Sequence, residues 1–166
     1  MNTFFIADTH FKHANILKYD KTRNQFGSIQ EHDEFLIEKW NEKVGPQDEV
    51  YHLGDFSFAD EAPIRARLNG KIHLILGNHD YKRKKFLGRA GFASVQDVLY
   101  LKKTNTFLSH YPHYSWPKSY HGCIHLFGHV HEAFHKVPGC AGLNLNVGAM
   151  WLGFAPWEYG EIQRLF

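Results

Sequence analysis

The chain has 166 residues, 43% of them hydrophobic and 22% charged, which is enough sequence for one well-packed core but not for two domains of usual size. This ordinary composition excludes a disordered tail, a collagen-like repeat and a small disulfide-dominated protein. Lys and Arg number 19 against 17 Asp and Glu, so no overall basic field predicts nucleic-acid binding, and we expect one domain over residues 1–166.

The first half of the chain alternates predicted strands and helices. Three short apolar runs predict buried strands, at residues 2–7, 48–53 and 71–76. Ser28 followed by Glu31 is typical of a helix start, and the apolar spacing after it predicts a helix over residues 29–43. Another helix is predicted over residues 60–68. Strands that alternate with helices indicate βαβ units around a mainly parallel sheet.

The second half of the chain is richer in strands. Short strands are predicted at residues 95–101, 106–109, 123–128 and 143–147, the first two as a hairpin. A helix is expected over residues 157–166. Parallel units followed by a strand-rich half predict an α/β fold in which two sheets pack together with helices outside.

The predicted strands are followed by segments rich in metal-ligating residue types. These segments are Asp8-x-His10, Gly54-Asp55, Gly77-Asn78-His79-Asp80, Ser109-His110 and Gly128-His129-Val130-His131. Asp, Asn and His supply the oxygen and nitrogen donors that suit Mn, Fe, Co or Zn. A lone histidine or aspartate at a strand end is more often a hydrogen-bonded or capping residue than a ligand. Five such segments in this order and spacing predict a metal site.

In order and spacing, the five segments resemble the motifs D-x-H, G-D, G-N-H-[DE], H and G-H-x-H of the calcineurin-like metallophosphoesterase superfamily. The resemblance implies the metallophosphoesterase fold, a four-layer αββα sandwich of two mixed β-sheets flanked by helices. It also implies two divalent metal ions, one held by Asp8, His10, Asp55 and His131 and the other by Asp55, Asn78, His110 and His129. Asp55 would bridge both ions, and His79 would face the scissile phosphate as the catalytic acid.

The implied reaction is hydrolysis of a phosphate ester bond by attack of a metal-bridging hydroxide. Two divalent ions, two carboxylates and one hydroxide leave a charge of about +1, which suits a phosphate anion, and two close metals lower the pKa of a shared water. Mn is the favoured ion, although the same ligands suit Fe, Zn, Ni or Co.

The segment from Asp8 to Ile16 resembles the D-T-H-F-x-H-x-N-I opening of a small bacterial and phage branch of the superfamily. His13 and Asn15 within it are predicted substrate contacts, with a plain surface position as the alternative for His13. Further along, Asn146-Val147-Gly148 resembles the N-V-G segment of this branch, but Met150 stands where an acidic residue is expected.

Two further segments contain candidate substrate contacts. The basic run of residues 82–85 follows the third motif, and Lys82 and Arg83 could hold a phosphate of a polynucleotide, with a solvated loop as the alternative. The aromatic loop of residues 111–121 contains His113 and begins beside a predicted ligand. Its rings could stack on bases or pack on the core.

Protein phosphatases of the superfamily extend the second motif to G-D-x-x-D-R-G, and this chain lacks the arginine, which makes phosphoproteins weaker candidates. We therefore predict a phosphodiesterase acting on nucleotide or nucleic-acid-type substrates. The alternatives are a phosphomonoesterase acting on small phosphorylated molecules and a catalytically silent scaffold with the same fold. The intact motifs argue against the scaffold.

No segment is apolar over a length that would span a bilayer, and the first residues do not resemble a secretion signal. Cys123 and Cys140 are expected to remain reduced, so we predict a cytoplasmic protein with no membrane association and no obligate protein partner. Thirteen histidines are the compositional anomaly, and six have no predicted role. These six are His32, His52, His73, His121, His125 and His135.

Overall fold

The structure, a computed structural model, describes the backbone of residues 1–166 and every side chain except those of Arg83 and Phe86. The first sheet has the strand order β4 (Ser94–Gln96), β3 (Lys71–Ile75), β2 (Glu49–His52), β1 (Thr3–Ile6) and β9 (Trp157–Glu158). The second sheet has the order β5 (Val98–Leu101), β6 (Thr106–Ser109), β7 (Ile124–Phe127) and β8 (Asn144–Asn146). The helices are α1 (Ile16–Tyr19), α2 (Ile29–Lys43), α3 (Ala62–Arg65), α4 (Lys84–Leu87) and α5 (Tyr159–Gln163).

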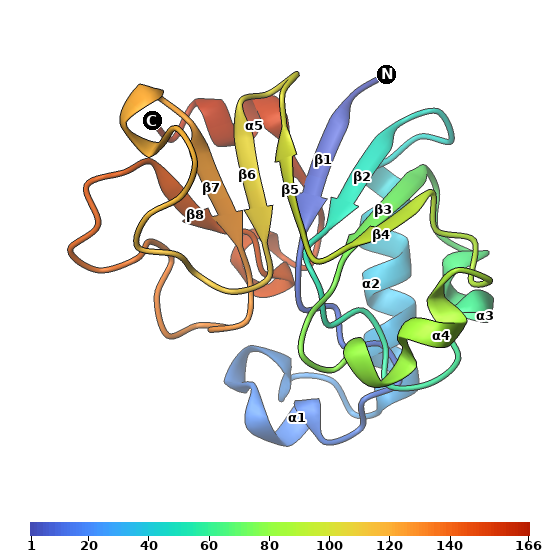
Figure 1. Ribbon diagram of the computed structural model, residues 1–166. Helices are drawn as coiled ribbons and strands as arrows, with labels where there is room; N and C mark the ends of the chain where they lie inside the picture. Colours follow the sequence, from blue (N-terminus) through green and yellow to red (C-terminus); the bar gives the residue numbers. More distant parts are fainter.

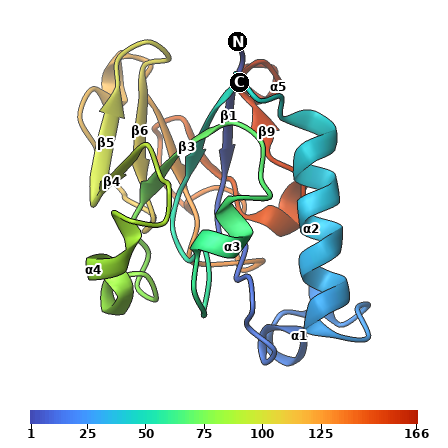
Figure 2. The same ribbon diagram turned by 90° about the vertical axis from the view of Figure 1, so that its right-hand side faces the viewer.

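Both sheets are mixed. Strands β1 to β4 are parallel to one another and β9 is antiparallel, while β6, β7 and β8 are parallel and β5 is antiparallel. The sheets pack face to face, and α2 covers the opposite face of the first sheet (Figures 1 and 2). The predicted fold class, two mixed β-sheets flanked by helices, is confirmed. Among the described helices, none has the length and apolar character needed to cross a bilayer.

The alternation of side chains along β1 explains why the first sheet lies between two apolar layers. Phe4 and Ile6 belong to the cluster that includes Trp40 of α2, whereas Phe5 and Ala7 belong to the cluster that includes Leu126 of the second sheet. Successive residues of a strand point to opposite faces, so a strand covered on both sides is apolar throughout. The short apolar run at the start of the chain is therefore the centre of the fold.

Three predicted elements differ from the structure. The strand predicted over residues 95–101 is two strands, because the chain leaves the first sheet after β4 and enters the second sheet at β5. The helix predicted over residues 157–166 begins as strand β9, and only residues 159–163 are helical. The helix predicted over residues 60–68 is the single turn α3. Each difference reflects a packing partner that local sequence does not reveal.

The two sheets are joined at the edge where their parallel strands end. The backbone N–H of Ala7 donates to Val147 (3.0 Å), and the N–H of Ala149 donates to the carbonyl of Ala7 (2.9 Å). Strands β1, β6 and β7 all point toward this edge, and α1 lies beyond it (Figure 1). The loops that follow these strands therefore meet in one region.

Most histidines without a predicted role are packing residues. His73 stacks on Tyr51 with ring centroids 4.8 Å apart, and His135 stacks on Trp151 at 4.4 Å. His125 is fully buried, with Nδ1 hydrogen-bonded to the Phe107 carbonyl (3.1 Å). Neutral imidazole is flat and carries one donor and one acceptor, which suits such positions.

Burial lowers the pKa of His125 to about 4, against an ordinary value of 6.5. Between these two pKa values, His125 is protonated in the unfolded chain but neutral in the folded protein. The free energy of unfolding should therefore fall as pH drops from about 6.5 toward 4, and His125 should account for roughly 3 kcal/mol of this loss. Urea unfolding at pH 7 and pH 4.5 measures the loss. The His125→Gln variant should lose clearly less stability over this range than the unmodified protein. Equal losses in the two proteins would contradict the assignment.

Candidate metal centre

The seven predicted ligands lie in the loops at the joined edge of the two sheets. Five of them have a left-handed backbone, namely Asp8 (φ 56°), His10 (φ 51°), Asp55 (φ 57°), His129 (φ 69°) and His131 (φ 46°). Such a conformation costs a non-glycine residue of the order of 1–3 kcal/mol and persists only where the surroundings enforce it. Because these five residues all have a costly backbone conformation, the positions of their side chains, and not the backbone energy, determine the shape of the loops.

Asp8, His10 and His131 form a first group of converging donor atoms. The Nε2 atoms of His10 and His131 are 3.2 Å apart, and Nε2 of His10 is 4.0 Å from Oδ1 of Asp8. Asp8 and His10 are almost completely buried, whereas the side chain of His131 is 27% exposed, so the group reaches solvent at His131.

A second group forms around Asn78. Its Oδ1 lies 3.0 Å from Nε2 of His110 and 3.0 Å from Nδ1 of His129. Nδ1 of His110 donates to the carbonyl of Leu53 (2.8 Å), which leaves Nε2 directed at the group. The structure thus brings together three residues from three separate motifs.

Asp55 lies between the two groups. Its Oδ2 is 3.9 Å from Nε2 of His10 in the first group and 3.6 Å from Nε2 of His110 in the second. Its Oδ1 accepts a hydrogen bond from the backbone N–H of His79 (3.0 Å). One carboxylate therefore faces both groups at once.

Glycines let the loops approach so closely. A Cβ on Gly128 would lie 2.6 Å from Oδ2 of Asp8, and a Cβ on Gly54, whose φ is 93°, would lie 2.6 Å from Nδ1 of His110. Both separations are shorter than any real Cβ contact, so no other residue fits. The glycines quoted with the motifs are thus steric requirements of the site.

Burial controls the protonation of the donors. It lowers the pKa of His10 well below the ordinary value, and it also lowers the pKa of His129, so these rings are neutral near pH 7. Burial raises the pKa of Asp8, with neighbouring imidazoles acting in the opposite direction. Neutral imidazole and carboxylate are the forms that bind metal ions.

The donor set fits divalent transition metals. Carboxylate oxygens and imidazole nitrogens of Asp8, His10 and His131, and likewise of Asp8, Asp55 and His110, lie within 4.8 Å of one another. Oxygen and nitrogen donors without thiolate suit Mn, Fe, Co and Zn. Nε2 of His10 and Nε2 of His131 are 3.2 Å apart, and the carboxylates of Asp8 and Asp55 are buried. No lysine or arginine side chain is among the described donors, so a bound cation would complete the site.

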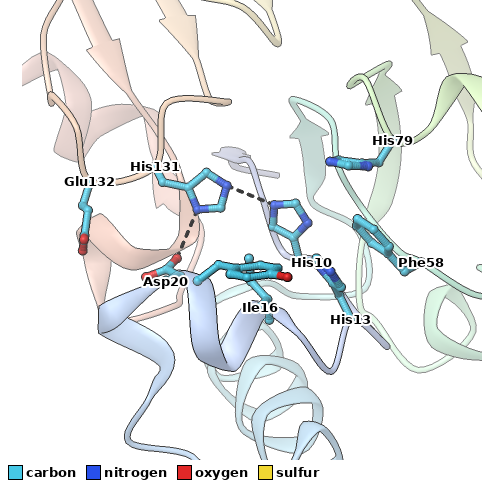
Figure 3. Close-up of a pocket in the computed structure, with 9 residues that line it drawn as sticks. His10, His13, Ile16, Asp20, Phe58, His79, His131 and Glu132 are labelled. Carbon is cyan, nitrogen blue, oxygen red and sulfur yellow. Dashed lines mark hydrogen bonds and ion pairs between the residues drawn. The ribbon is translucent and has the colours of Figure 1, made fainter.

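Asp20 and Arg23 lie beside the first donor group, and the sequence analysis did not single them out. Oδ2 of Asp20 accepts from Nδ1 of His131 (3.1 Å) and from Nε of Arg23 (3.0 Å), and Figure 3 shows His131 between Asp20 and His10. Arg23 is fully buried and donates to the backbone carbonyls of Thr9 and Asp8. Burial would lower the pKa of His131, but the hydrogen bond and charge of Asp20 raise it overall. No sequence pattern predicts the hydrogen bond between Asp20 and His131, because the two residues are 111 positions apart.

Asp80 and Asn146 hold the ligand loops in place. Oδ2 of Asp80 accepts from the N–H groups of Asp55 and Gly77, both at 2.8 Å. Burial raises the pKa of Asp80 to about 6 despite these hydrogen bonds. Nδ2 of Asn146 donates to the carbonyl of His131 (2.8 Å). The motif residue Asp80 and the N-V-G asparagine are therefore loop anchors.

His79, the predicted acid, is at the solvent-facing side of the groups. Its side chain is 43% exposed, and Nε2 lies 3.8 Å from Oδ2 of Asp55. The ring contacts Phe58 (centroids 4.5 Å apart), which in turn stacks on His13 (3.7 Å). Figure 3 shows these three rings on one side of His10. His13 therefore lies at the site. Phe58, which contacts both His13 and His79, was not among the predicted site residues.

The other predicted substrate contacts are placed differently from one another. Lys82 is exposed and lines a recess together with His79. The basic run is helical, in a 3-10 turn and α4, and its three lysines are exposed to solvent. Arg83 belongs to the side chains that the structure does not describe. Asn15 is exposed at the start of α1 and, among the described residues, is not one that lines a recess beside the site.

The aromatic loop has one buried ring, that of Trp116, whereas Tyr111, Tyr114 and Tyr120 are exposed. Trp116 is buried against the outer face of the second sheet and donates from Nε1 to the carbonyl of Cys123 (2.9 Å). His113 contacts Ser109 and His125 there, rather than the metal groups. Tyr111 differs, because its ring lies 4.6 Å from that of His129. His113 therefore lies against the second sheet, away from the donor groups.

Residues 1–156 match the family model of the calcineurin-like phosphoesterase superfamily domain. The chain belongs to the calcineurin-like phosphoesterase superfamily. Together with the donor groups, this membership identifies a metal-dependent hydrolase of phosphate esters.

Relatives of this calcineurin-like phosphoesterase occur in archaea and phages. An uncharacterized protein of Methanocaldococcus jannaschii is 35% identical over 133 residues, which cover 77% of this chain and 68% of that protein. The Gene 66 protein of Mycobacterium phage D29 is 31% identical over 193 residues, covering 95% of this chain and 92% of its own. A protein of unknown function from Aquifex aeolicus has a similar crystal structure, with TM-score 0.72, 25% identity and 99% coverage of both chains. The phage relatives agree with the predicted small branch.

Replacing Asp20 tests its control of His131. Asp20→Asn keeps the size of the side chain but removes the charge that orients and polarises the ring, so metal affinity should fall roughly 10- to 100-fold. Calorimetric titration with Mn²⁺ measures the affinity, and circular dichroism establishes the temperature range in which the variant is folded. Glu132→Gln is the matched control, because Glu132 is exposed and neighbours His131 in sequence. Equal affinities for Asp20→Asn and the control would refute the positioning role.

Proposed function

We propose that this phosphoesterase is a dinuclear phosphodiesterase acting on nucleotide or nucleic-acid-type substrates. One divalent ion would be held by Asp8, His10, Asp55 and His131, and the other by Asp55, Asn78, His110 and His129. The proposal includes a single domain over residues 1–166.

The position of Asp55 is the observation that carries the dinuclear proposal. Its Oδ2 is within 4 Å of an imidazole nitrogen of each group, His10 on one side and His110 on the other. A carboxylate shared in this way suits two ions close together, whereas a single structural metal site would take four ligands of its own.

Each residue around the site has a chemical task in this proposal. The ions that these residues would hold would supply Lewis-acid chemistry, which lowers the pKa of a bound water and offsets charge on the phosphate. His79 donates a proton to the leaving oxygen from its exposed ring, a contribution typically worth ~100- to 10,000-fold. The backbone N–H of His79 also donates to Oδ1 of Asp55, so the proposed acid is linked directly to the proposed shared ligand.

The substrate proposal rests on the surroundings of His79. The recesses beside it are open, which suits a diester with groups on both sides of the phosphate. The chain lacks the arginine of the protein-phosphatase motif, which disfavours phosphoproteins. A phosphomonoesterase acting on small molecules is the second candidate, and a silent scaffold is the third.

Mn is the proposed ion, although Fe, Zn, Ni and Co match the same oxygen and nitrogen donors. We also propose a cytoplasmic location. Cys123 and Cys140 are both free thiols, which is typical of a reducing compartment.

A pair of chromogenic substrates tests the function. We expect the enzyme loaded with Mn²⁺ to hydrolyse bis(4-nitrophenyl) phosphate faster than 4-nitrophenyl phosphate, and EDTA to abolish both activities. The assay is repeated with Fe²⁺, Co²⁺, Ni²⁺ and Zn²⁺. A faster monoester reaction would favour the second candidate, and silence on both substrates with every metal would favour the scaffold.

Two variants separate metal binding from proton donation. Asp55→Asn should lose most metal and activity together, because the shared carboxylate is removed. His79→Ala should retain its metal content but lose turnover by ~100-fold or more, because the proton donor is missing. Elemental analysis beside steady-state kinetics gives both quantities. Full activity of His79→Ala would exclude it as the acid.

A further inference from the structure

Two recesses of different chemistry meet at Phe58 and His79. The first has a volume of about 400 Å³, and its lining includes His10 and His131 of the first donor group as well as His13, Ile16 and Tyr19. The second has a volume of about 360 Å³ and is lined by Ser57, Phe58, His79 and Lys82. A substrate whose phosphate lies beside His79 would therefore extend into a different environment on each side.

The wall of the first recess is built from flat and apolar groups. The rings of His13 and Phe58 are nearly parallel, with an interplanar angle of 7° and centroids 3.7 Å apart, so Phe58 is held in a fixed orientation. Ile16 contributes a buried aliphatic surface, and Tyr19, which is 74% exposed, stands at the mouth. Half-buried rings beside an aliphatic floor suit a planar ligand of low charge.

Charge distinguishes the two recesses. No lysine or arginine among the described residues lines the first recess, and its charged members are the carboxylates Asp20 and Glu132. Asp20 already binds His131 and Arg23, whereas Glu132 is exposed and can accept from N–H groups of a ligand. The second recess contains the ammonium group of Lys82. Away from the metal-ligating residues His10 and His131, the first recess therefore offers no positive group to a phosphate, whereas the second recess offers Lys82.

We propose that the first recess binds a nucleobase of the substrate against the stacked rings of His13 and Phe58, and that Lys82 binds the next phosphate of the same nucleotide chain on the other side of His79. This inference rests on the proposed phosphodiesterase function and makes the substrate a short oligonucleotide. A base stacked on an aromatic ring is sequence-tolerant, so discrimination between bases is expected to be weak.

The thymidine dinucleotide TpT and an analogue in which one thymine is replaced by an abasic sugar test the base site. Binding is measured by calorimetry in EDTA, where no turnover occurs, and KM is measured with Mn²⁺. We expect TpT to bind roughly 10-fold more tightly than one of the two abasic isomers, and Phe58→Ala to remove that preference. Phe58→Tyr, which keeps a ring, should retain it. Tyr120→Ala is the control, because Tyr120 is 90% exposed and lies outside the recess lining.

The phosphate site is tested with 5′-phosphorylated TpT and Lys82→Ala. The variant should lose several-fold in affinity for the phosphorylated dinucleotide, with a weaker salt dependence, and should bind TpT as before. Equal binding of TpT and both abasic isomers would overturn the base site while leaving phosphodiesterase activity intact. Tight, Phe58-dependent binding without hydrolysis by any metal-loaded form would instead contradict the proposed function and leave the base site standing.

Discussion

Two buried carboxylates are the constraint on which the structure depends. Asp8 and Asp55 are 0% and 2% exposed, and a buried charge without compensation is strongly unfavourable. The fold compensates with backbone N–H groups, since His129 donates to Asp8 at 2.9 Å and His79 donates to Asp55 at 3.0 Å. These contacts require sharp turns, which explains the left-handed backbone of both aspartates and the glycines beside them. Cations of the proposed centre would supply the remaining compensation.

The joining of the two sheets makes such a site possible. Asp8 follows a strand of the first sheet, and His131 follows a strand of the second, so a shift of one sheet relative to the other would separate them. The hydrogen bonds between Ala7 and residues 147 and 149 prevent this shift directly beside Asp8. Asn146 fixes the His131 loop from the second sheet, and Arg23 fixes the Asp8 loop from the other side. The rigidity of the site is therefore a property of the sheet interface.

The histidine content reflects two uses of one side chain. Around the proposed centre, burial keeps His10 and His129 neutral and ready to bind a cation. Elsewhere neutral imidazole serves as a flat polar packing group, as for His52, which is fully buried and hydrogen-bonded to Thr9 (2.9 Å), with burial lowering its pKa to about 3. In both settings desolvation of the ring lowers its pKa. The surplus of histidine is thus explained by burial more than by catalysis.

The sequence by itself determined the fold class, the order of the ligand motifs and most strands, because these features depend on apolar alternation and on residues that are near in the chain. The strand-end position of Asp8, Asp55 and His131 follows from the same local pattern. Tertiary structure alone decided that Asp20 orients His131, that Phe58 stacks on His13 beside His79, and that the chain changes sheets after β4. Each of these depends on which distant segments pack together, and no local propensity encodes a contact across 111 positions.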